Sequence, residues 1–374
     1  KTIKSNIPAF NEDNYVQNSD GTYTLNRKDE ENSDDKSYDF KVRYPNQVLS
    51  MLNKYPIDDL FDTIIIDEGQ DFHYSWYKIL SKILSKNGDL LLLADNNQNI
   101  YKNKLEWMSD KKYKTKFSGE WGKLEESRRV KNKSIINVSN TLIDMLDDLD
   151  KEKIKFYSKD QKEFRFDKPY INWIDSKFNK IPAIQNSNSN STNKTCRDCG
   201  KHLDDNEHAH REKTLNKCKY CYEIFNECKS HILETYNTMK DKYNMNDITV
   251  LVPFQDELTD IFDFFHKNKV ECTATIDKKM NHKLSFLDKS KDYKNEFALN
   301  NNNDMVKIST IHSYKGLSAP NVIILTYPTF ATDISSDNLI YTAITRTEES
   351  LVTINRNSKY ANIGKQVMKQ FKAA

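Results

Sequence analysis

The sequence lacks any long apolar run. Its apolar stretches, such as those at 64–66 and 90–94, hold only a few residues, whereas about 20 apolar residues are needed to cross a bilayer. It also shows no signal peptide, because Lys-Thr-Ile-Lys at the start leads into polar sequence. Neither a membrane-spanning nor a secreted protein is therefore expected, and the sequence predicts a cytoplasmic one.

The chain has almost no net charge. Its 57 Lys and Arg residues nearly cancel 55 Asp and Glu residues, which leaves +2. This balance neither requires nor excludes a nucleic-acid partner, because only a local basic patch would decide that. With 374 residues, 37% of them hydrophobic, the chain is long enough for two or three domains. Its bias toward Asn and Lys says nothing about mechanism.

Two regions alternate apolar strands with helical patterns. In the first, apolar runs at 63–66 and 90–93 flank a helix that starts near Trp76 and is ended by Asn87-Gly88. Both runs are apolar throughout, which is typical of a parallel β-α-β unit. In the rest of the chain, strands are expected at 248–252, 270–275, 306–311, 322–325 and 351–354, and helices at 134–149, 223–242 and 257–266. The pattern predicts the α/β class.

Two acidic residues follow the first strand. Asp67 and Glu68 lie at its carboxyl end, where open parallel sheets place ligands. An Asp there can hold Mg²⁺ on nucleotide phosphates, and the adjacent Glu can polarise an attacking water. An acid pair alone is a weak signal, since acids also cap strands and helices. The longer string at 67–72, Asp-Glu-Gly-Gln-Asp-Phe, is far more specific.

This string resembles motif II of the UvrD/Rep-like superfamily 1 DNA helicases, in the branch with AAA-like cores. Four later segments resemble the next motifs of this family in the family's order. They are residues 94–101 for motif III, 124–129 for motif IV, 310–317 for motif V and 339–347 for motif VI. Five ordered matches make coincidence implausible. The resemblance implies RecA-like parallel-sheet domains of the P-loop NTPase fold. It also implies that ATP binds between two such domains and that its hydrolysis moves single-stranded DNA.

The resemblance assigns roles to individual residues. The implied catalytic residues are Glu68, Gln98, Arg129 and Arg346, with Gln98 near the γ-phosphate and Arg346 as the arginine finger. The implied ligands of ATP and Mg²⁺ are Asp67, Glu68, Gln98, Arg128, Arg129, Gly316 and Arg346, of which Asp67 holds the magnesium. The implied DNA contacts are Tyr101, Thr310, His312 and Lys315.

Three positions depart from the family pattern. Ala94 replaces a Gly, Arg128 replaces the aromatic residue that stacks on adenine, and Ser318 replaces a Glu implicated in ribose binding. A guanidinium can also stack, so Arg128 keeps its candidate role, whereas the ribose contact at Ser318 would be lost. Trp107 and Trp121 are candidates for base stacking, although Trp is more often a packing residue; Tyr101 has the same ambiguity.

The phosphate-binding loop of a nucleotide motor, Gly-x-x-x-x-Gly-Lys-Ser/Thr, does not occur in the chain. None of its 8 glycines completes the pattern. Three explanations stay open: a C-terminal part of a longer helicase, a catalytically inactive DNA-binding or scaffold protein in a nuclease or defence complex, or a motor whose missing half is another polypeptide. The first is preferred, because the later motifs are intact and the sequence begins without Met. This polypeptide alone is expected to hydrolyse little or no ATP.

Four of the six cysteines form two Cys-x-x-Cys pairs, Cys196 with Cys199 and Cys218 with Cys221. The 18 residues between the pairs are typical of a zinc ribbon, in which four thiolates bind one Zn²⁺. An iron–sulfur cluster on four cysteines is the alternative. Basic residues around the pairs predict a surface for nucleic acid or a protein partner, made of Arg197, Lys201, Arg211, Lys213, Lys217 and Lys219.

The predicted organisation has four parts. A polar segment at 1–45 precedes an incomplete first RecA-like domain at 46–165, which carries motifs II to IV. A second RecA-like domain at 166–374 carries motifs V and VI, and the zinc ribbon is an insertion at 186–226. The expected partner is single-stranded DNA or DNA with single-stranded tails. Translocation polarity, the choice between DNA and RNA, and oligomeric state stay open.

Overall fold

The computed structural model describes two compact units. Unit 1 comprises Lys1–Asp95 with Asn103–Glu120, and unit 2 comprises Asn96–Lys102 with Trp121–Ala374. The described residues are 44–55, 57, 60–101, 103, 105–108, 115, 117, 121–157, 170–176, 196–201, 217–276, 304–328 and 336–372, with the short strands β1 (Tyr15–Gln17) and β2 (Tyr23–Leu25). Among these residues, no helix is long and apolar enough to span a membrane.

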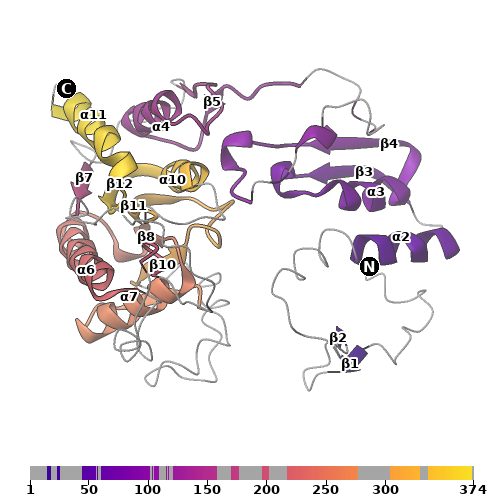
Figure 1. Ribbon diagram of the computed structural model, residues 1–374. Coiled ribbons are helices and arrows are strands. Elements are labelled where there is room, and N and C mark those ends of the chain that lie inside the picture. The colour runs from indigo at the N-terminus through magenta and orange to yellow at the C-terminus, as the bar shows by residue number, and fades with distance from the viewer. Residues whose placement is uncertain are drawn as a thin grey trace. The chain divides into compact units, whose positions relative to one another are not determined.

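Unit 1 contains the parallel β-α-β crossover that its apolar runs predict. β3 (Phe61–Ile66) and β4 (Leu84–Leu92) pair in parallel, and α3 (Tyr74–Ile83) connects them (Figure 1). The prediction that Asn87-Gly88 ends the helix is wrong, because α3 ends at Ile83 and this pair lies within β4. The strand register shifts there, and a Cβ on Gly88 would lie 3.0 Å from Asp62 O. Glycine therefore marks an irregularity in the strand, where the backbones approach closely.

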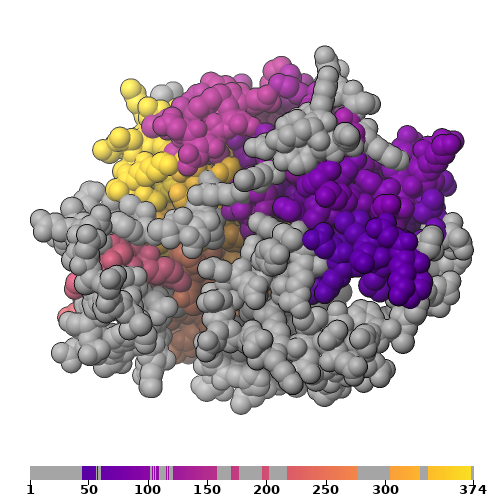
Figure 2. All heavy atoms as spheres, turned by 45° about the vertical axis from the view of Figure 1, so that its right-hand side comes forward, coloured from indigo at the N-terminus to yellow at the C-terminus, as the bar shows by residue number. Residues whose placement is uncertain are grey.

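A further helix, α2 (Tyr44–Lys54), begins where only a polar segment was expected. Pro45 lies in its first turn, where a missing backbone N–H costs nothing. α2 packs beside α3 within unit 1, and Figure 2 shows its indigo atoms next to the purple atoms of the residues that follow. The small core of the unit includes Trp107, which is 2% exposed and lies 5.5 Å from the Tyr77 ring. Trp107 is therefore a packing residue.

Unit 2 is built on a six-stranded parallel sheet. Its strands are β7 (Ile171–Asp175), β8 (Ile248–Val252), β9 (Cys272–Ala274), β10 (Val306–Thr310), β11 (Ala319–Leu325) and β12 (Thr347–Asn355). They lie in the order β7-β12-β11-β8-β10-β9, and every pairing is parallel. All five strands expected in this part of the sequence are present, and β7 adds an edge.

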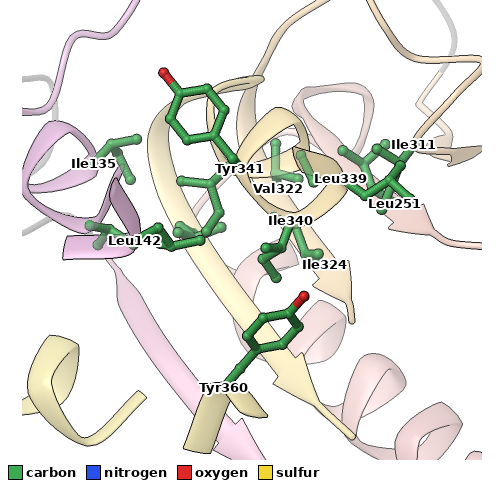
Figure 3. Close-up of a cluster of buried hydrophobic side chains, with 14 of the residues drawn as sticks. Ile135, Leu142, Leu251, Ile311, Val322, Ile324, Leu339, Ile340, Tyr341 and Tyr360 are labelled. Carbon is green, nitrogen blue, oxygen red and sulfur yellow. The ribbon is translucent and has the colours of Figure 1, made fainter. Parts of the chain in front are cut away.

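Helices cover both faces of this sheet. Along β11, Val322 and Ile324 pack into one apolar cluster and Ile323 and Leu325 into another, because successive side chains of a strand point to opposite faces. The first cluster includes residues of α4 (Lys133–Met145), α10 (Ser336–Ile344) and α11 (Ala361–Lys372), and part of it is drawn in Figure 3. The second includes residues of α6 (Lys219–Lys240) and α7 (Gln255–Lys267). This layered α/β arrangement is consistent with a RecA-like helicase core.

Helix α4 packs within unit 2. α4 was assigned to the first domain, but Ile135 and Leu142 lie in the same apolar cluster as α10 and α11 of unit 2. Asn132 before α4 donates a 2.7 Å hydrogen bond from its side chain to Glu349 O of β12. The described residues 121–157 therefore group with unit 2, as do residues 96–101.

Candidate functional site

The carboxylates at 67 and 68 lie in a tight turn after β3. Glu68 has left-handed backbone angles, φ 52° and ψ 44°, which are uncommon for residues other than Gly, Asn or Asp. Gly69 N donates to Leu93 O at 2.7 Å, and Leu93 N donates to Ile66 O at 2.8 Å. The side chain of Asp67 is exposed and that of Glu68 is half-buried. The turn thus presents an accessible carboxylate at the carboxyl end of the strand.

Gln70 holds the Glu68 side chain in place. It is fully buried. Its Nε2 donates to Glu68 Oε2 at 2.5 Å, and its Oε1 accepts from Asp95 N at 2.9 Å. Gln70 thereby ties the turn after β3 to Asp95 of motif III. In the sequence, the only signal for Gln70 is a neutral amide within an acidic string, which assigns it no role.

Three segments that are distant in sequence meet at Gln98 within unit 2. Gln98 ends the 3₁₀ turn Asn96–Gln98, Lys315 lies in the turn after β10, and Arg346 follows α10. Arg346 Nη2 donates to Gln98 Oε1 at 2.7 Å, and Lys315 Nζ donates to Gln98 O at 2.9 Å. The fold therefore joins residues of motifs III, V and VI.

Arg346 is buried and held in one orientation. Only 3% of the residue is exposed. Its Nε donates to Thr342 O at 3.3 Å and its Nη1 to Leu317 O at 3.4 Å. Burying a guanidinium is costly unless its N–H groups are paired, so these carbonyls and Gln98 Oε1 stabilise it. A fixed positive charge of this kind can stabilise negative charge on a bound phosphate.

Asparagine side chains hold the turn that carries Gln98. Asn338 Nδ2 on α10 donates to Asn97 O at 2.9 Å. Asn97 Oδ1 in turn accepts from Asp150 N at 2.6 Å, and Asn97 Nδ2 donates to Asp150 O at 3.1 Å. These residues set the position of Gln98 from two sides. Sequence alone does not mark these asparagines, because single asparagines cannot be told apart in an Asn-rich chain.

The candidate DNA contacts lie on the turn after β10 and on the segment after Gln98. Thr310 is buried, and its Oγ1 accepts from Ser313 N at 3.1 Å, which shapes the turn. The Tyr101 and His312 rings lie 5.8 Å apart, and Tyr101 is 49% exposed. Burial, and then the positive charge of Lys315, lower the pKa of His312 below its ordinary value. His312 is therefore neutral at pH 7.

Two further motif residues have backbone or stacking roles of their own. Gly316 has φ 84°, the left-handed region that favours glycine. The Arg128 guanidinium lies 4.5 Å from the centre of the Tyr157 ring, so its aromatic partner belongs to unit 2 itself. Arg129 is exposed. Trp121 is 45% exposed, so it is not a buried packing residue as Trp107 is.

The residue that replaces the family's Glu at 318 nevertheless lies beside a carboxylate. Ser318 Oγ donates to Glu348 Oε1 at 2.6 Å. Glu348 Oε2 also pairs with Lys131 Nζ at 2.8 Å. Glu348 on β12 directly follows motif VI, but no local signal in the sequence marks it, because only the fold brings it to Ser318.

The four paired cysteines form one compact, buried cluster. Their Sγ atoms all lie within 4.8 Å of one another. Cys199 Sγ and Cys218 Sγ are 3.8 Å apart, which fits two ligands of a tetrahedral zinc with Zn–S bonds of about 2.3 Å. Gly200, with φ 72°, lets the first pair turn, and Gly200 N donates to Cys196 O at 2.7 Å. Four thiol donors at this spacing suit Zn²⁺ or an iron–sulfur cluster.

The expected basic surface around the cysteines is wrong for two of its residues. The Lys217 side chain is 0% exposed and that of Arg197 is 23% exposed, and both pair with acidic side chains of unit 2. These two charges are therefore neutralised by ion pairs within unit 2 and do not form part of a basic surface. Lys201 and Lys219 are exposed, and Arg211 and Lys213 lie outside the described residues.

Comparisons with known proteins identify two segments of the chain. Residues 22–105 match the UvrD/REP helicase N-terminal domain, and residues 305–354 match the UvrD-like helicase C-terminal domain. No curated protein matches the chain. Among solved structures, the C-terminal domain of a possible DNA helicase from Lactobacillus plantarum WCFS1 is similar, with 8% identity and a TM-score of 0.34 over 64% of this chain and 97% of that one. Only the two domain matches bear on function.

Proposed function

We propose that this chain, two segments of which match UvrD-like helicase domains, is part of an ATP-dependent DNA helicase or translocase. In this role it couples ATP hydrolysis to movement along single-stranded DNA. The hydrogen bond between Arg346 and Gln98 is the observation that supports the proposal most strongly. It joins two residues that the helicase motifs assign to the same reaction, although their segments are distant in sequence.

In this proposal, Asp67, Glu68 and Arg346 each have a role in ATP hydrolysis. ATP with bound Mg²⁺ supplies the phosphoanhydride bond whose cleavage drives the motor. Asp67 offers an exposed carboxylate as magnesium ligand, and Glu68, which Gln70 holds in place, accepts a proton from the attacking water. Arg346 supplies a fixed positive charge for the phosphate. The phosphate-binding loop does not occur in this sequence, so this half of the reaction's machinery has to come from elsewhere.

A short segment supports coupling between nucleotide and DNA. Gln98 bonds to Arg346, and only three residues further on Tyr101 lies against His312. The 3₁₀ turn before them is pinned by Asn97 and Asn338. A change in the Arg346–Gln98 bond when a phosphate binds would therefore be transmitted through a short, restrained segment to the proposed DNA-contacting rings.

A matched pair of variants tests the catalytic proposal in the natural gene product. Glu68→Gln removes the base and keeps the shape, so DNA-stimulated ATP hydrolysis should fall by at least about 100-fold. Glu152→Gln removes a carboxylate from an exposed ion pair with Lys123, so its rate should stay at that of the wild type. Equal rates for Glu68→Gln and wild type would leave a catalytically inactive DNA-binding or scaffold protein as the better description.

We also propose that Cys196, Cys199, Cys218 and Cys221 bind one structural Zn²⁺. The buried cluster and its 3.8 Å Sγ–Sγ separation support this. Elemental analysis of the purified protein should give one zinc per chain and no iron, with no visible absorption. A brown protein with iron and acid-labile sulfide would instead favour a cluster.

A further inference from the structure

A buried group of charged residues connects the cysteine cluster to the main sheet of unit 2. At its centre is Glu257, in the first turn of α7 and wholly buried. Arg356, directly after β12, forms two 2.7 Å hydrogen bonds to the two oxygens of Glu257. Lys217 Nζ lies 2.7 Å from Glu257 Oε1, and Arg197 Nη2 lies 3.1 Å from the same oxygen.

Two further acids complete this group, which we call the Glu257 network. Asp198 pairs with Lys217, and Asp198 Oδ2 lies 3.4 Å from Arg356 Nη1. Asp256 accepts from Arg197 Nη1 at 2.7 Å. Three cations therefore meet three anions: Arg197, Lys217 and Arg356 face Asp198, Asp256 and Glu257.

Half of the Glu257 network is carried by the cysteine loops. Arg197 and Asp198 are the two residues between the paired Cys196 and Cys199, and Lys217 directly precedes Cys218. Their backbone positions are therefore set by the geometry of the four thiols. The other half, Asp256, Glu257 and Arg356, lies on the framework of the sheet.

Such a network is stable only when every partner is in place. Removing charges from water is costly, and a buried ion left without its partner is strongly destabilising. If the cysteine loops opened, Glu257 would lose two of its three cations and keep only Arg356, and Asp256 would lose Arg197. The loops thus cannot move without disturbing the ends of the strands.

We propose that metal binding by the four cysteines clamps the carboxyl edge of the unit 2 sheet through the Glu257 network. The proposal rests on the metal site proposed above, but not on helicase activity. Arg356 Nε donates to Thr326 O after β11 at 2.9 Å, so the clamp reaches the ends of β11 and β12 and the start of α7. The module is thus an integral part of the domain rather than an appended ribbon.

The clamp also reaches the edge that carries motif V. The carboxyl ends of parallel strands share one edge of the sheet, and β10 pairs with β8. Ile311 N, at the start of the motif V turn, donates to Val252 O at the end of β8 at 2.9 Å. α7 begins three residues after Val252. Loss of the metal therefore loosens the turn that holds His312 and Lys315.

Hydrogen exchange measured on the whole chain tests the clamp. The metal is counted first, and is then removed with a thiol-specific mercurial and a chelator. Protection should fall at residues 254–262, 308–314 and 352–358, as well as in the cysteine loops. Protection at 135–143 and 361–369, which pack on the opposite face, should change least. A loss confined to 196–201 and 217–221 would overturn the clamp and leave the metal site standing.

A second measurement covers the case in which the metal-free chain unfolds altogether. Because coupling is reciprocal, disturbing the Glu257 network should weaken the metal site. Glu257→Gln should release zinc to a chromogenic chelator about 10-fold faster or more, as loss of an outer partner does in other metal sites. The control, Asp263→Asn, removes a carboxylate from an exposed pair with Lys267 on the same helix. Equal release rates in Glu257→Gln, Asp263→Asn and wild type would refute the clamp, whereas absence of bound metal would refute the metal site itself.

Discussion

Arg346 donates a 2.7 Å hydrogen bond to Gln98, across 248 positions of the sequence. The bond lies within unit 2, which includes the segment of motif III that carries Gln98. Motifs II and III are neighbours in sequence, yet the residues up to Asp95 belong to unit 1 and those from Asn96 to Lys102 belong to unit 2. Gln98 thus lies in the same compact unit as motif VI and contacts it directly.

The first prediction concerns this bond. Gln98→Ala should lower the free energy of unfolding of unit 2 by about 1.5–3 kcal/mol, because a hydrogen bond to a buried charged group is lost. Urea unfolding followed by fluorescence measures it. In a double-mutant cycle with Arg346→Met, the two changes should couple by about 0.5–3 kcal/mol. Simple additivity would mean that the bond contributes nothing in solution.

The turn after β3 makes a second prediction. A Cβ on Gly69 would lie 2.3 Å from Leu92 Cδ1 and 3.1 Å from Leu93 O. Gly69→Ala should therefore destabilise unit 1 by about 1–3 kcal/mol, since a well-packed site must shift. Gly122→Ala is the control, because nothing lies within 4 Å of a Cβ there. Thermal unfolding should separate the two variants, and equal melting temperatures would contradict the geometry of this turn.

A third prediction concerns the protonation of His312. Burial, and then Lys315, lower its pKa below 6.5, so the imidazole should titrate below 6.5 when followed by NMR. Lys315→Met should raise this pKa, because a positive charge is removed, but burial should still keep it below 6.5. Because the pKa of His312 is lower in the folded state than in the unfolded chain, folding favours the neutral imidazole. The contribution of this group to the free energy of unfolding is therefore complete above about pH 6.5, and it is lost as the pH falls through the pKa of the folded state. A pKa that does not move in the variant would rule out the charge effect.

The fourth prediction concerns acid stability at Glu257. Burial raises the pKa of this carboxyl, but Arg356, Lys217 and Arg197 outweigh it and hold the pKa at about 2, below its ordinary 4.5. Its stabilising contribution, on the order of 3 kcal/mol, is complete above about pH 4.5 and is lost as pH falls toward 2. Denaturant unfolding of wild type and Glu257→Gln should differ most near pH 6 and converge as pH approaches 2. A pH-independent difference would show that this ionisation does not stabilise the fold.

Sequence by itself determined the class of the fold and the identity of the motifs. The run 322–325 is apolar at every position and the run 248–252 at every position but Thr249, a pattern typical of strands in a sheet buried on both faces. The strands formed where those runs lie, and the cysteine spacing predicted the cluster that the fold forms. These features are local or periodic, so they can be recognised from short stretches of chain.

Only the tertiary structure decided which residues act together. Gln70, Asn97 and Glu348 carry no local signal, and their partners are fixed by the folding of the strands. Lys217 looked like a surface residue, because a charged side chain in a basic segment is normally solvated. Its partner Glu257 lies 40 positions away, and a charge can be buried only where the fold brings an opposite charge to it. The environment of a charge is thus a long-range property, which no short segment of sequence contains.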